Sequence, residues 1–429
     1  MKVRPAAALV GDVAVPGVKS VTHRALLLGA IAEGETEIRN FGRAQDTEST
    51  VRALLALGVV VDELDVDTVV VHGVGLRGLC APAEPIDCGN AGTLLRLLAG
   101  IVAGQHGEFT LTGDESLRSR PMERIAEPLR AMGAEVETTD GRPPVIVRGG
   151  RALHPISYKL PVASAQVKSC VLLAGLYADR GPTTVVELGA QTRDHTERML
   201  SAMGARVRSS PRQASVWPVE RLRPLQLEVA GDFSSAAPFL VGAALLAGSE
   251  VRVHGVNLNP TRTGLLDVLE RMGARVTVFN RRAVGGEPAG DVEVRPAPLV
   301  AVTIEADEVP KLVDELPLVA LAGTHARGTS VIRGAGELRA KESDRIATVV
   351  EGLRALGARI SERPDGFEVA GVPQRLRGGR LRAHGDHRLV MLGAVAGLAS
   401  VNGVDVEGAE AAAISFPGFF ELLDSVTRR

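Results

Sequence analysis

Residues 20–38, SVTHRALLLGAIAEGETEI, join a helix-like run of small apolar residues to a short strand, and this stretch decides the fold because it recurs. Residues 90–104, NAGTLLRLLAGIVAG, repeat the pattern. Similar runs begin near Ser164, Ser234, Asp314 and Asp386, so that successive starts lie 70 to 80 residues apart. Self-similarity at a nearly fixed period indicates a repeat architecture. Six copies divide most simply into two similar domains of three.

A second element repeats in the same phase as the first. It is an amphipathic helix that ends at glycine and turns into a strand, as in LLALGVVV at Gly58, LRAMGAEV at Gly133, LSAMGARV at Gly204, LERMGARV at Gly273 and LRALGARI at Gly357. Glycine after the last periodic residue is typical of a helix C-terminus. Each repeat therefore reads helix, strand, helix, strand, strand.

A solenoid is the alternative architecture for such a repeat, with each unit stacked only on its neighbours. Solenoid periods are usually about 20 to 50 residues, which is shorter than the period here. Repeats of this size favour packing round a shared axis. We expect one helix of each repeat to be buried, with all six buried helices starting on the same side.

Composition limits the classes of protein that the chain can belong to. With 429 residues, 45% hydrophobic and 23% charged, it is typical of a globular protein of two domains. The 49 basic and 51 acidic residues give a net charge of −2, which argues against general attraction to nucleic acid or to an anionic membrane.

The same sequence predicts neither a metal nor a cofactor. The three cysteines form no C-x-x-C pair, and no cluster of His, Asp or Glu has metal-ligand spacing. The N-terminal apolar run is too short for a signal peptide, and no run reaches the roughly 18 apolar residues of a membrane span. We expect a cytoplasmic protein.

Polar residues gather at the starts of the repeated helices. Ser20, Asn90, Ser164, Ser234, Asp314 and Asp386 suit helix capping. Capping does not explain the other groups at the same repeat position, which are Lys19 and Arg24, Gln166 and Lys168, and His387 and Arg388. The second helices add Arg120, Arg193 and the run KESDR at 341–345. Helix N-termini and arginines both bind phosphate and carboxylate, so we predict a site for a ligand with several negative charges.

Ten motifs carry a resemblance to a known family: PGVKSVTHRALLL, GNAGTLLR, SLRSRPM, SAQVKS, TRDHTERML, GDFSSAAPFL, DELPLVALA, AKESDR, GDHR and SFPGFF. In that order they resemble the 5-enolpyruvylshikimate-3-phosphate synthases, a family of enolpyruvyl transferases, along nearly the whole chain. The resemblance implies an α/β fold of two similar domains, each with three pseudo-threefold βαβαββ units and buried parallel helices. It implies a discontinuous domain of residues 1–17 and 231–429 and a continuous domain of residues 18–230, with the active site in the cleft between them.

The resemblance also implies an enzyme. Such an enzyme transfers the enolpyruvyl group of phosphoenolpyruvate to the 5-hydroxyl of shikimate 3-phosphate and releases phosphate, in the shikimate pathway of aromatic amino acid biosynthesis. Its partners are these small molecules, and relatives are usually monomeric. Glyphosate, an anion that resembles phosphoenolpyruvate, is expected to compete for the same subsite, because Gly92 leaves space that a methyl group would fill.

Roles pass to individual residues through the same resemblance. Shikimate 3-phosphate is expected at Lys19, Ser20, Arg24, Ser164, Ala165, Gln166, Arg193, Asp314 and Lys341. Phosphoenolpyruvate is expected at Lys19, Gly92, Arg120, Gln166, Arg345 and Arg388.

The reaction needs one base and one acid that exchange roles. The hydroxyl adds to C2 of the enol phosphate while C3 accepts a proton, and the tetrahedral intermediate then loses phosphate. Asp314 is the expected base at the hydroxyl, with Glu342 and Lys19 handling the proton at C3.

Three positions depart from common family patterns. Val18 stands where many members have Ser or Asp, Ile414 where some have Lys, and Glu337 where some have Asn. The Ile414 difference puts one phosphoenolpyruvate contact in doubt, and Arg345 and Arg388 are then expected to carry more of that binding.

Two other functions stay open at the level of sequence. UDP-N-acetylglucosamine enolpyruvyl transferase shares the repeats but typically carries a Cys in the loop that here reads GDESLRSRP, residues 113–121. A non-catalytic anion-binding protein of the same fold is the other, although binding alone would not need Asp314, Lys341 and Glu342 together.

Overall fold

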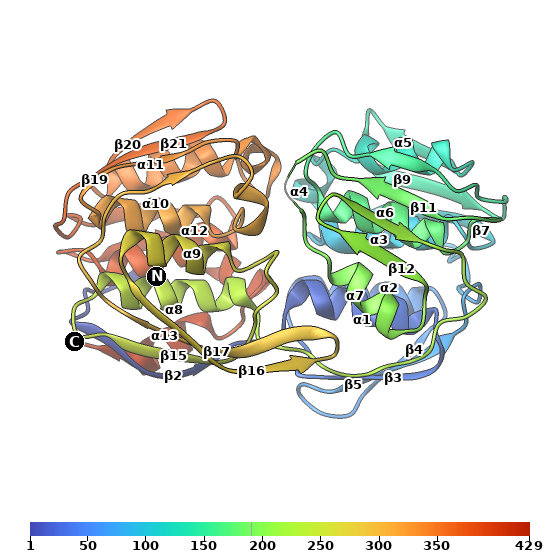
Figure 1. The fold of residues 1–429 in the computed structure, drawn as a ribbon, viewed down its shortest axis with the longest axis horizontal. Helices are drawn as coiled ribbons and strands as arrows, with labels where there is room; N and C mark the ends of the chain where they lie inside the picture. Colours follow the sequence, from blue (N-terminus) through green and yellow to red (C-terminus); the bar gives the residue numbers. More distant parts are fainter. Residues whose placement is uncertain (190) are drawn as a thin grey trace. The chain divides into compact units, whose positions relative to one another are not determined.

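The computed structural model describes residues 1–189 and 191–429 of the chain (Figure 1). They form two compact units. Unit 1 comprises Met1–Pro16, Ala230–Arg282 and Pro288–Arg429, and unit 2 comprises Gly17–Val229 and Ala283–Glu287. The chain therefore passes between the units at 16/17 and 229/230, and five residues from a hairpin in the second half of the chain are grouped with unit 2.

Unit 2 holds the first three repeats. The first is α1 (Lys19–Ala30), β3 (Glu33–Arg39), α2 (Gln45–Ala56), β4 (Val60–Glu63) and β5 (Val69–Val74). The second is β6 (Ile86–Asp87), α3 (Gly92–Val102), β7 (Gly107–Thr112), α4 (Glu115–Arg118), α5 (Glu123–Ala131), β8 (Glu135–Thr139) and β9 (Arg142–Gly149). The third is β10 (Ser157–Lys159), α6 (Ala165–Gly175), β11 (Thr183–Val186), α7 (His195–Ala202), β12 (Val207–Ser210) and β13 (Gln213–Val216), followed by β14 (Gln226–Glu228).

Unit 1 holds the last three repeats and both ends of the chain. The chain begins with β1 (Lys2–Val3) and β2 (Ala8–Ala14). The fourth repeat is α8 (Phe233–Leu245), β15 (Glu250–Asn257), α9 (Gly264–Met272), β16 (Arg275–Val284) and β17 (Glu287–Arg295). The fifth is β18 (Thr303–Ile304), η1 (Val309–Lys311), α10 (Leu316–His325), β19 (Gly328–Ile332), η2 (Gly336–Ala340), α11 (Arg345–Ala355), β20 (Arg359–Arg363) and β21 (Gly366–Gly371). The sixth is β22 (Gly379–Arg382), α12 (His387–Leu398), β23 (Val404–Glu407), η3 (Ala409–Ile414), α13 (Phe419–Val426) and β24 (Thr427–Arg428).

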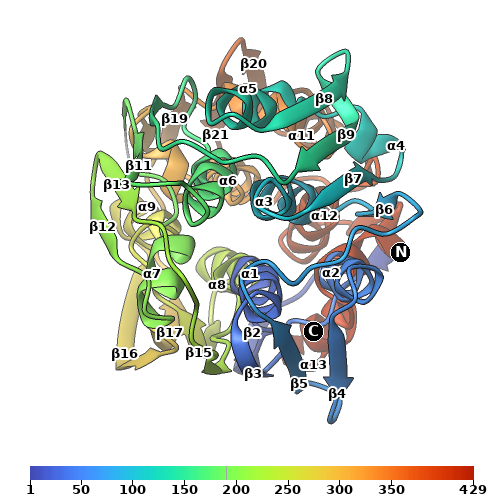
Figure 2. The same cartoon turned by 90° about the vertical axis from the view of Figure 1, so that its right-hand side faces the viewer.

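The predicted order of helix, strand, helix, strand, strand is confirmed in the first five repeats, and the sixth ends with α13 and β24 instead. Each unit builds three sheets. Those of unit 2 have the orders β14-β3-β5-β4, β6-β7-β9-β8 and β10-β11-β13-β12. Those of unit 1 have the orders β16-β17-β15-β2-β24, β18-β19-β21-β20 and β1-β23-β22. Figure 2 shows the sheets of unit 2 around α1, α3 and α6, an arrangement unlike the linear stack of a solenoid.

The first helix of each repeat is buried almost all round. In α8, for example, 12 of 13 residues are buried, as expected of a helix that is apolar on every face. Small residues let these helices approach closely. At Gly100 a Cβ atom would lie 2.3 Å from the carbonyl oxygen of Cys170, so α3 and α6 pack with no room for a side chain there.

Helix ends match the sequence pattern in part. The five glycines that follow the second helices, Gly58, Gly133, Gly204, Gly273 and Gly357, all have positive φ, as predicted. Capping at the six first helices is confirmed only for Ser164 and Asp386. The cap of α8 is Asp232, not Ser234, and α1, α3 and α10 have no side-chain cap. Asn90 and Asp314 bond to arginine side chains, which accounts for the missing caps of α3 and α10.

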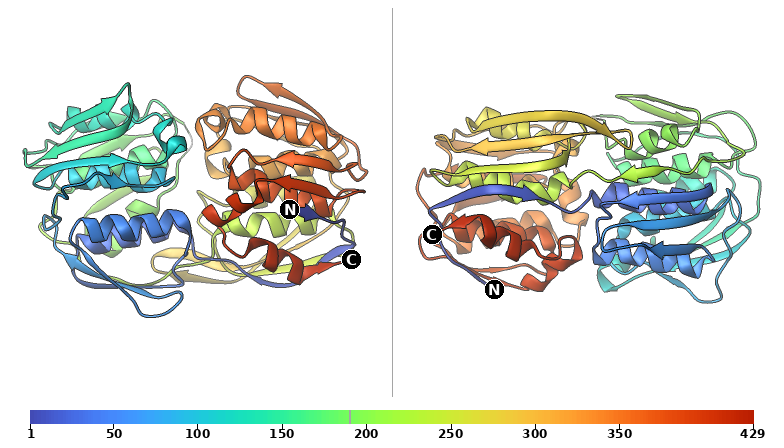
Figure 3. Two further views of the ribbon diagram at one scale, coloured as in Figure 1. Left: turned by 180° about the vertical axis from the view of Figure 1, so that it is seen from behind. Right: turned by 90° about the horizontal axis from the view of Figure 1, so that it is seen from below.

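Strands are exchanged where the chain passes between the units. In the other repeats the strand before the first helix pairs in parallel with the strand after it, as β6 does with β7. β2 precedes α1 but pairs with β15, and β14 precedes α8 but pairs with β3. The two crossings lie next to each other, because Asp232 N–H donates to the carbonyl oxygen of Pro16 at 2.7 Å. Both chain ends lie in unit 1 (Figure 3), where β24 pairs with β2.

Candidate active site

The predicted site residues fall into two sets, one in each unit. Unit 2 carries Lys19, Ser20, Arg24, Gly92, Arg120, Ser164, Ala165, Gln166 and Arg193, and unit 1 carries Asp314, Lys341, Glu342, Arg345 and Arg388. We call these sets the unit 2 half-site and the unit 1 half-site. In each, side-chain contacts join the N-terminal ends of the buried helices, so the helix starts of one unit face the same way.

Lys19 begins α1 in the unit 2 half-site. Its Nζ lies 2.6 Å from Oδ2 of Asp46, a buried carboxylate in the first turn of α2. Sequence reasoning missed Asp46, because it does not stand at a start of the repeated apolar helix. The ion pair holds the lysine in a fixed direction beside the start of α1.

Arg24 lies one turn further along α1 and is buried. Its Nε donates to Thr196 Oγ1 at 2.7 Å, its Nη2 to Ser169 Oγ at 2.9 Å and its Nη1 to the carbonyl oxygen of Ser20 at 2.8 Å. All three acceptors are neutral, and in the described part of the chain no carboxylate forms an ion pair with Arg24. The pKa of Arg24 is lowered to about 10, mainly by burial and also by the charge of Arg193, while the charges of Glu197 and Glu287 oppose this effect. A buried cation whose hydrogen-bond partners are all neutral is a candidate site for an anionic ligand.

Gly92, Arg120 and Gln166 come together at the starts of α3 and α6. Arg120 Nη2 donates to Asn90 Oδ1 at 2.6 Å, and Gln166 Nε2 donates to Thr93 Oγ1 at 2.8 Å. A Cβ atom on Gly92 would lie 3.2 Å from Nη1 of Arg120, which is tight packing.

Arg96 is a further member of this group that sequence reasoning missed. Its Nη1 donates to Gln166 Oε1 and would lie 3.2 Å from a Cβ atom on Gly92. The residue stands in the motif GNAGTLLR, one turn after Gly92, so its place on the same helix face was a usable signal.

Ser164, Ala165 and Arg193 complete the unit 2 half-site. Ser164 Oγ accepts a hydrogen bond from Val167 N–H at the start of α6, and Ala165 is the first residue of that helix. Arg193 lies two residues before α7, and its charge lowers the pKa of Arg24.

Arg345 is the centre of the unit 1 half-site and is 1% exposed. It forms two hydrogen bonds to Asp386, at 2.8 and 3.1 Å, and one to Glu342 at 2.6 Å. Its Nη1 lies 3.3 Å from Asp314 Oδ1, and Lys341 Nζ lies 3.9 Å from the same oxygen. The structure thus gathers the predicted Asp314, Lys341, Glu342 and Arg345.

Arg262 is a second cation beside Asp314 and was not predicted. Its Nη1 lies 3.6 Å from Asp314 Oδ2, and its Nη2 lies 3.5 Å from Glu315 Oε1 and donates to Ser234 Oγ. Burial would lower the pKa of Arg262, but Glu315, Asp314 and Asp232 outweigh burial and raise it. Arg262 stands 11 residues before Gly273, just as Arg193 stands 11 residues before Gly204, so the repeat phase held a usable signal that sequence reasoning overlooked.

Arg388 is the remaining predicted cation of unit 1. Its N–H donates to Asp386 Oδ1 at 2.9 Å, and its Nη1 donates to the carbonyl oxygen of Ser234 at 3.2 Å. In the part of unit 1 that the structure describes, the guanidinium forms no ion pair with a carboxylate. Ile414 packs against the apolar core at the end of η3 and brings no charge to this region.

The described residues include no group of three or more His, Cys, Asp or Glu side chains arranged to hold a metal ion. Among the same residues, no helix has the length and apolar character needed to cross a membrane.

Comparison with known proteins gives one consistent result. Residues 3–423 match the family model described as EPSP synthase (3-phosphoshikimate 1-carboxyvinyltransferase). Two curated relatives with the name 3-phosphoshikimate 1-carboxyvinyltransferase are each 50% identical: one from Alkalilimnicola ehrlichii, with 98% of this chain and 94% of the relative covered, and one from Acidithiobacillus ferrooxidans, with 97% and 95% covered.

Solved structures are similar as well. The EPSP synthase structure from Acinetobacter baumannii matches with a TM-score of 0.87 at 42% identity, covering 99% of this chain and 97% of that chain. The enolpyruvyl transferase NikO from Streptomyces tendae matches with a TM-score of 0.77 at 21% identity, covering 99% and 96%, and shares the fold.

Proposed function

The chain belongs to the EPSP synthase family. We propose that residues of both half-sites bind the substrates and catalyse the reaction of that family. The reaction is the transfer of the enolpyruvyl group of phosphoenolpyruvate to shikimate 3-phosphate, a step of aromatic amino acid biosynthesis. The predicted fold, an α/β enolpyruvyl transferase fold, is confirmed by the two similar solved structures.

The assignment of substrates to residues rests on the burial of Arg24 and on its hydrogen-bond partners. Arg24 is a buried cation with only neutral hydrogen-bond partners, at the meeting point of α1, α6 and α7. A dianionic phosphate would supply the missing counter-charge. Shikimate 3-phosphate is therefore placed on unit 2, held by Lys19, Ser20, Arg24, Ser164, Ala165, Gln166 and Arg193, with Asp314 and Lys341 of unit 1 at its reacting hydroxyl.

Phosphoenolpyruvate is placed on Gly92 and on cations of both units. Arg120 and Lys19 come from unit 2, and Arg345 and Arg388 come from unit 1. The guanidinium of Arg388 resembles that of Arg24, because its described hydrogen-bond partner is neutral, the carbonyl oxygen of Ser234. An anionic substrate would supply its counter-charge. Arg345 already bonds to three carboxylates, so much of its contribution is to hold Asp314 and Glu342 in place.

Asp314 is the proposed base. Cations flank both of its oxygens, Arg345 at 3.3 Å and Arg262 at 3.6 Å, and an ionised carboxylate is the form that can accept the proton of the hydroxyl. Glu342 and Lys19 are the proposed partners for the proton at C3 of phosphoenolpyruvate. We propose that Lys19 and Asp314 act on the same substrates, which requires the two half-sites to come together and exclude water.

We also propose the domain boundaries that the sequence predicts, with residues 1–17 and 231–429 as one domain and residues 18–230 as the other. We propose further that the enzyme acts as a monomer in the cytoplasm. Light scattering at assay concentrations tests the first point, and cell fractionation tests the second.

Steady-state phosphate release from phosphoenolpyruvate tests the assignment, with shikimate 3-phosphate and UDP-N-acetylglucosamine offered as alternative acceptors. Turnover with shikimate 3-phosphate is expected, and turnover with the nucleotide sugar alone would contradict it. Arg24→Met should raise KM for shikimate 3-phosphate about tenfold or more, since hydrogen bonds to charged groups contribute about 1.5–3 kcal/mol each. Arg221→Met, at an exposed position of the same unit, is the matched control and should leave KM unchanged.

A further inference from the structure

A buried ionic cluster lies beneath the unit 2 half-site and is used by none of the roles above. Its centre is Lys168 on α6, whose side chain is 2% exposed. The Nζ atom lies 3.0 Å from Glu187 Oε1 and 2.8 Å from Glu197 Oε1. Lysine is almost never fully buried unless it is paired, so the site must depend on these carboxylates.

The first arm of the cluster fixes the backbone directly before Arg193. Glu187 accepts hydrogen bonds from Thr192 N–H, at 3.1 and 3.2 Å, and from Thr192 Oγ1. Lys168 Nζ donates to the carbonyl oxygen of the same threonine at 3.2 Å. Both backbone polar groups of Thr192 are therefore held by buried side chains.

The second arm fixes the first turn of α7. Glu197 pairs with Lys168, and its neighbour Thr196 accepts the hydrogen bond from Arg24. Ser169, next to Lys168 on α6, bonds to both Thr196 and Arg24. One lysine therefore lies behind both cations that face the proposed phosphate, Arg24 and Arg193.

Stability alone is a weak reason for such a cluster. Removing three charged groups from water is costly, and apolar side chains of similar volume often serve a core as well or better. Burial raises the pKa of Glu197 despite the opposing effect of Lys168, which reflects that cost. What apolar side chains could not do is hold the N–H and carbonyl groups of Thr192 in one orientation.

We propose that Lys168, Glu187 and Glu197 form a positioning cluster that sets the affinity for shikimate 3-phosphate by orienting Arg193 and Arg24, and that does not contribute to phosphoenolpyruvate binding. The inference rests on the proposed placement of shikimate 3-phosphate on unit 2. Lys168 touches neither substrate in this arrangement.

The main test is the full-length triple variant Lys168→Met, Glu187→Gln and Glu197→Gln, which removes all three charges at nearly constant volume. KM for shikimate 3-phosphate should rise about tenfold or more, with KM for phosphoenolpyruvate within about twofold of the wild type. A general loss of structure would move both constants or kcat, so the split between the two substrates identifies positioning. An unchanged KM for shikimate 3-phosphate in a folded variant would overturn the proposal.

A milder variant decides the matter if the triple variant does not fold. Thr192→Val removes one hydroxyl donor and keeps every charge, and it should raise KM for shikimate 3-phosphate several-fold without affecting phosphoenolpyruvate. A wild-type value for this variant would count against the cluster in that case. Val185→Ala in the core strand β11 is the control, since it should lower the unfolding midpoint and leave both KM values unchanged.

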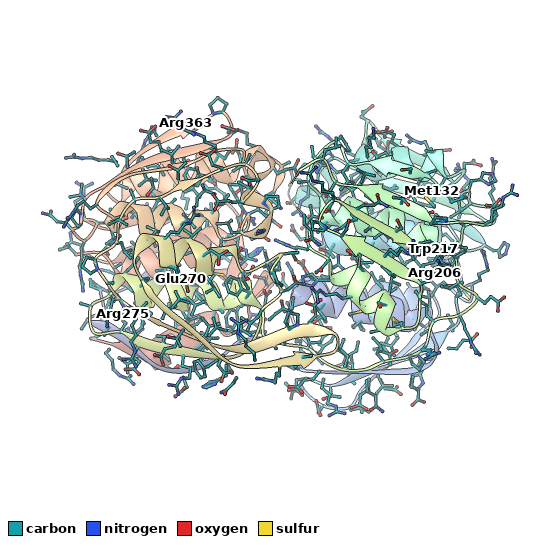
Figure 4. The ribbon with its side chains drawn as sticks, in the orientation of Figure 1. Met132, Arg206, Trp217, Glu270, Arg275 and Arg363 are labelled. Atoms are coloured by element: carbon teal, nitrogen blue, oxygen red, sulfur yellow. The ribbon has the colours of Figure 1, made fainter. Side chains whose placement is uncertain are left out.

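The single tryptophan reports the folding of unit 2 in every variant. Trp217 lies beside β12 with the Arg206 guanidinium 4.2 Å from its ring centre (Figure 4).

Arg193→Ala separates the proposed placement of shikimate 3-phosphate on unit 2 from the proposed positioning role of the cluster. If it leaves KM for shikimate 3-phosphate unchanged, the placement of the substrate is wrong. If it raises KM but the cluster variants do not, only the positioning role is wrong.

Discussion

Arg24 and Arg345 are both enclosed arginines, and they differ in what surrounds them. Arg345 bonds to the carboxylates of Asp386, Glu342 and Asp314. Arg24 bonds to two hydroxyl groups and one carbonyl group. The charge of Arg345 is thus paired with carboxylates inside its own unit, whereas the hydrogen bonds of Arg24 are all to neutral groups. The same residue type holds carboxylates in one half-site and is proposed to bind a substrate phosphate in the other.

Asp314→Ala should lower kcat by about 10²- to 10⁴-fold, the usual contribution of a positioned general base. Binding of shikimate 3-phosphate should remain measurable by calorimetry, because its phosphate is placed on unit 2. Glu308→Ala removes a carboxylate from a partly exposed ion pair with Arg271 in the same unit and should leave kcat unchanged. Full activity of Asp314→Ala would exclude this residue as the base.

Gly92→Ala should weaken inhibition by glyphosate more than it weakens phosphoenolpyruvate binding. The added methyl group would lie 3.2 Å from the guanidinium of Arg120, and overpacking of this kind costs about 1–3 kcal/mol, or roughly ten- to a hundredfold in affinity. Inhibition measured against varied phosphoenolpyruvate gives the constant. Gly336→Ala, where a Cβ atom has no neighbour within 4 Å, is the control. Inhibition that does not compete with phosphoenolpyruvate would contradict the steric argument.

The repeat pattern of the sequence predicted much of the candidate site, although its signals were not all used. Lys19, Arg24 and Arg388 could be found because they share a repeat position at the start of a buried helix. Arg96, on the helix face of Gly92, and Arg262, at the repeat position of Arg193, also carried sequence signals, whereas the contact of Asp46 with Lys19 is seen only in the tertiary structure. The roles of the predicted residues in binding and catalysis remain predictions.

At the scale of elements, Asp386 joins two helices. It caps α12 through Arg388 N–H and bonds to Arg345 at the start of α11 through both oxygens. Burial alone would raise the pKa of Asp386, but the charge of Arg345 outweighs burial and holds the pKa below its ordinary value. The carboxylate therefore stabilises the fold above its unfolded pKa of about 4, and that contribution is lost as the pH falls through the lower, folded value.

Asp386→Asn should lower the free energy of unfolding of unit 1 by about 3–5 kcal/mol at pH 7, because it leaves Arg345 underpaired. It should also flatten the dependence of stability on pH below about pH 4. Urea unfolding followed by circular dichroism measures both effects, since the one tryptophan lies in unit 2. Asp405→Asn, a half-exposed partner of the chain's first amino group, should change stability by less than about 1 kcal/mol. An equally steep acid transition in Asp386→Asn would exclude this carboxylate as its source.

Helix positions were more predictable than helix caps. Six runs such as LLLGAIA and LVALAG gave the buried helices, because such apolar density needs burial on all sides. Capping by the predicted residue was wrong at four of the six starts, and at Asn90 and Asp314 a nearby arginine competes with the backbone for the same oxygen. The exchange of β2 and β14 could not be read from the sequence, because both strands fit either partner by their pattern alone.

At the scale of the whole molecule, unit 2 is nearly continuous in sequence, and all strands of its three sheets come from residues 17–229. A fragment of residues 17–229 should therefore fold cooperatively, with Trp217 fluorescence reporting the transition. A fragment of residues 17–224 lacks β14, which pairs with β3 and extends its sheet, and it should be less stable by several kcal/mol or fail to fold. Equal stability of the two fragments would show that β14 contributes little to unit 2.

The exchange of strands also orders events on the ribosome. β2 leaves the ribosome long before its partners β15 and β24, which come from the second half of the chain. The 235 residues between β2 and β15 take about 12–47 s to synthesise. Throughout that time the segment ALVGDVA is an unpaired, apolar strand edge, the kind of surface to which chaperones and other nascent chains attach. A strand made early is thus among the last to complete its sheet.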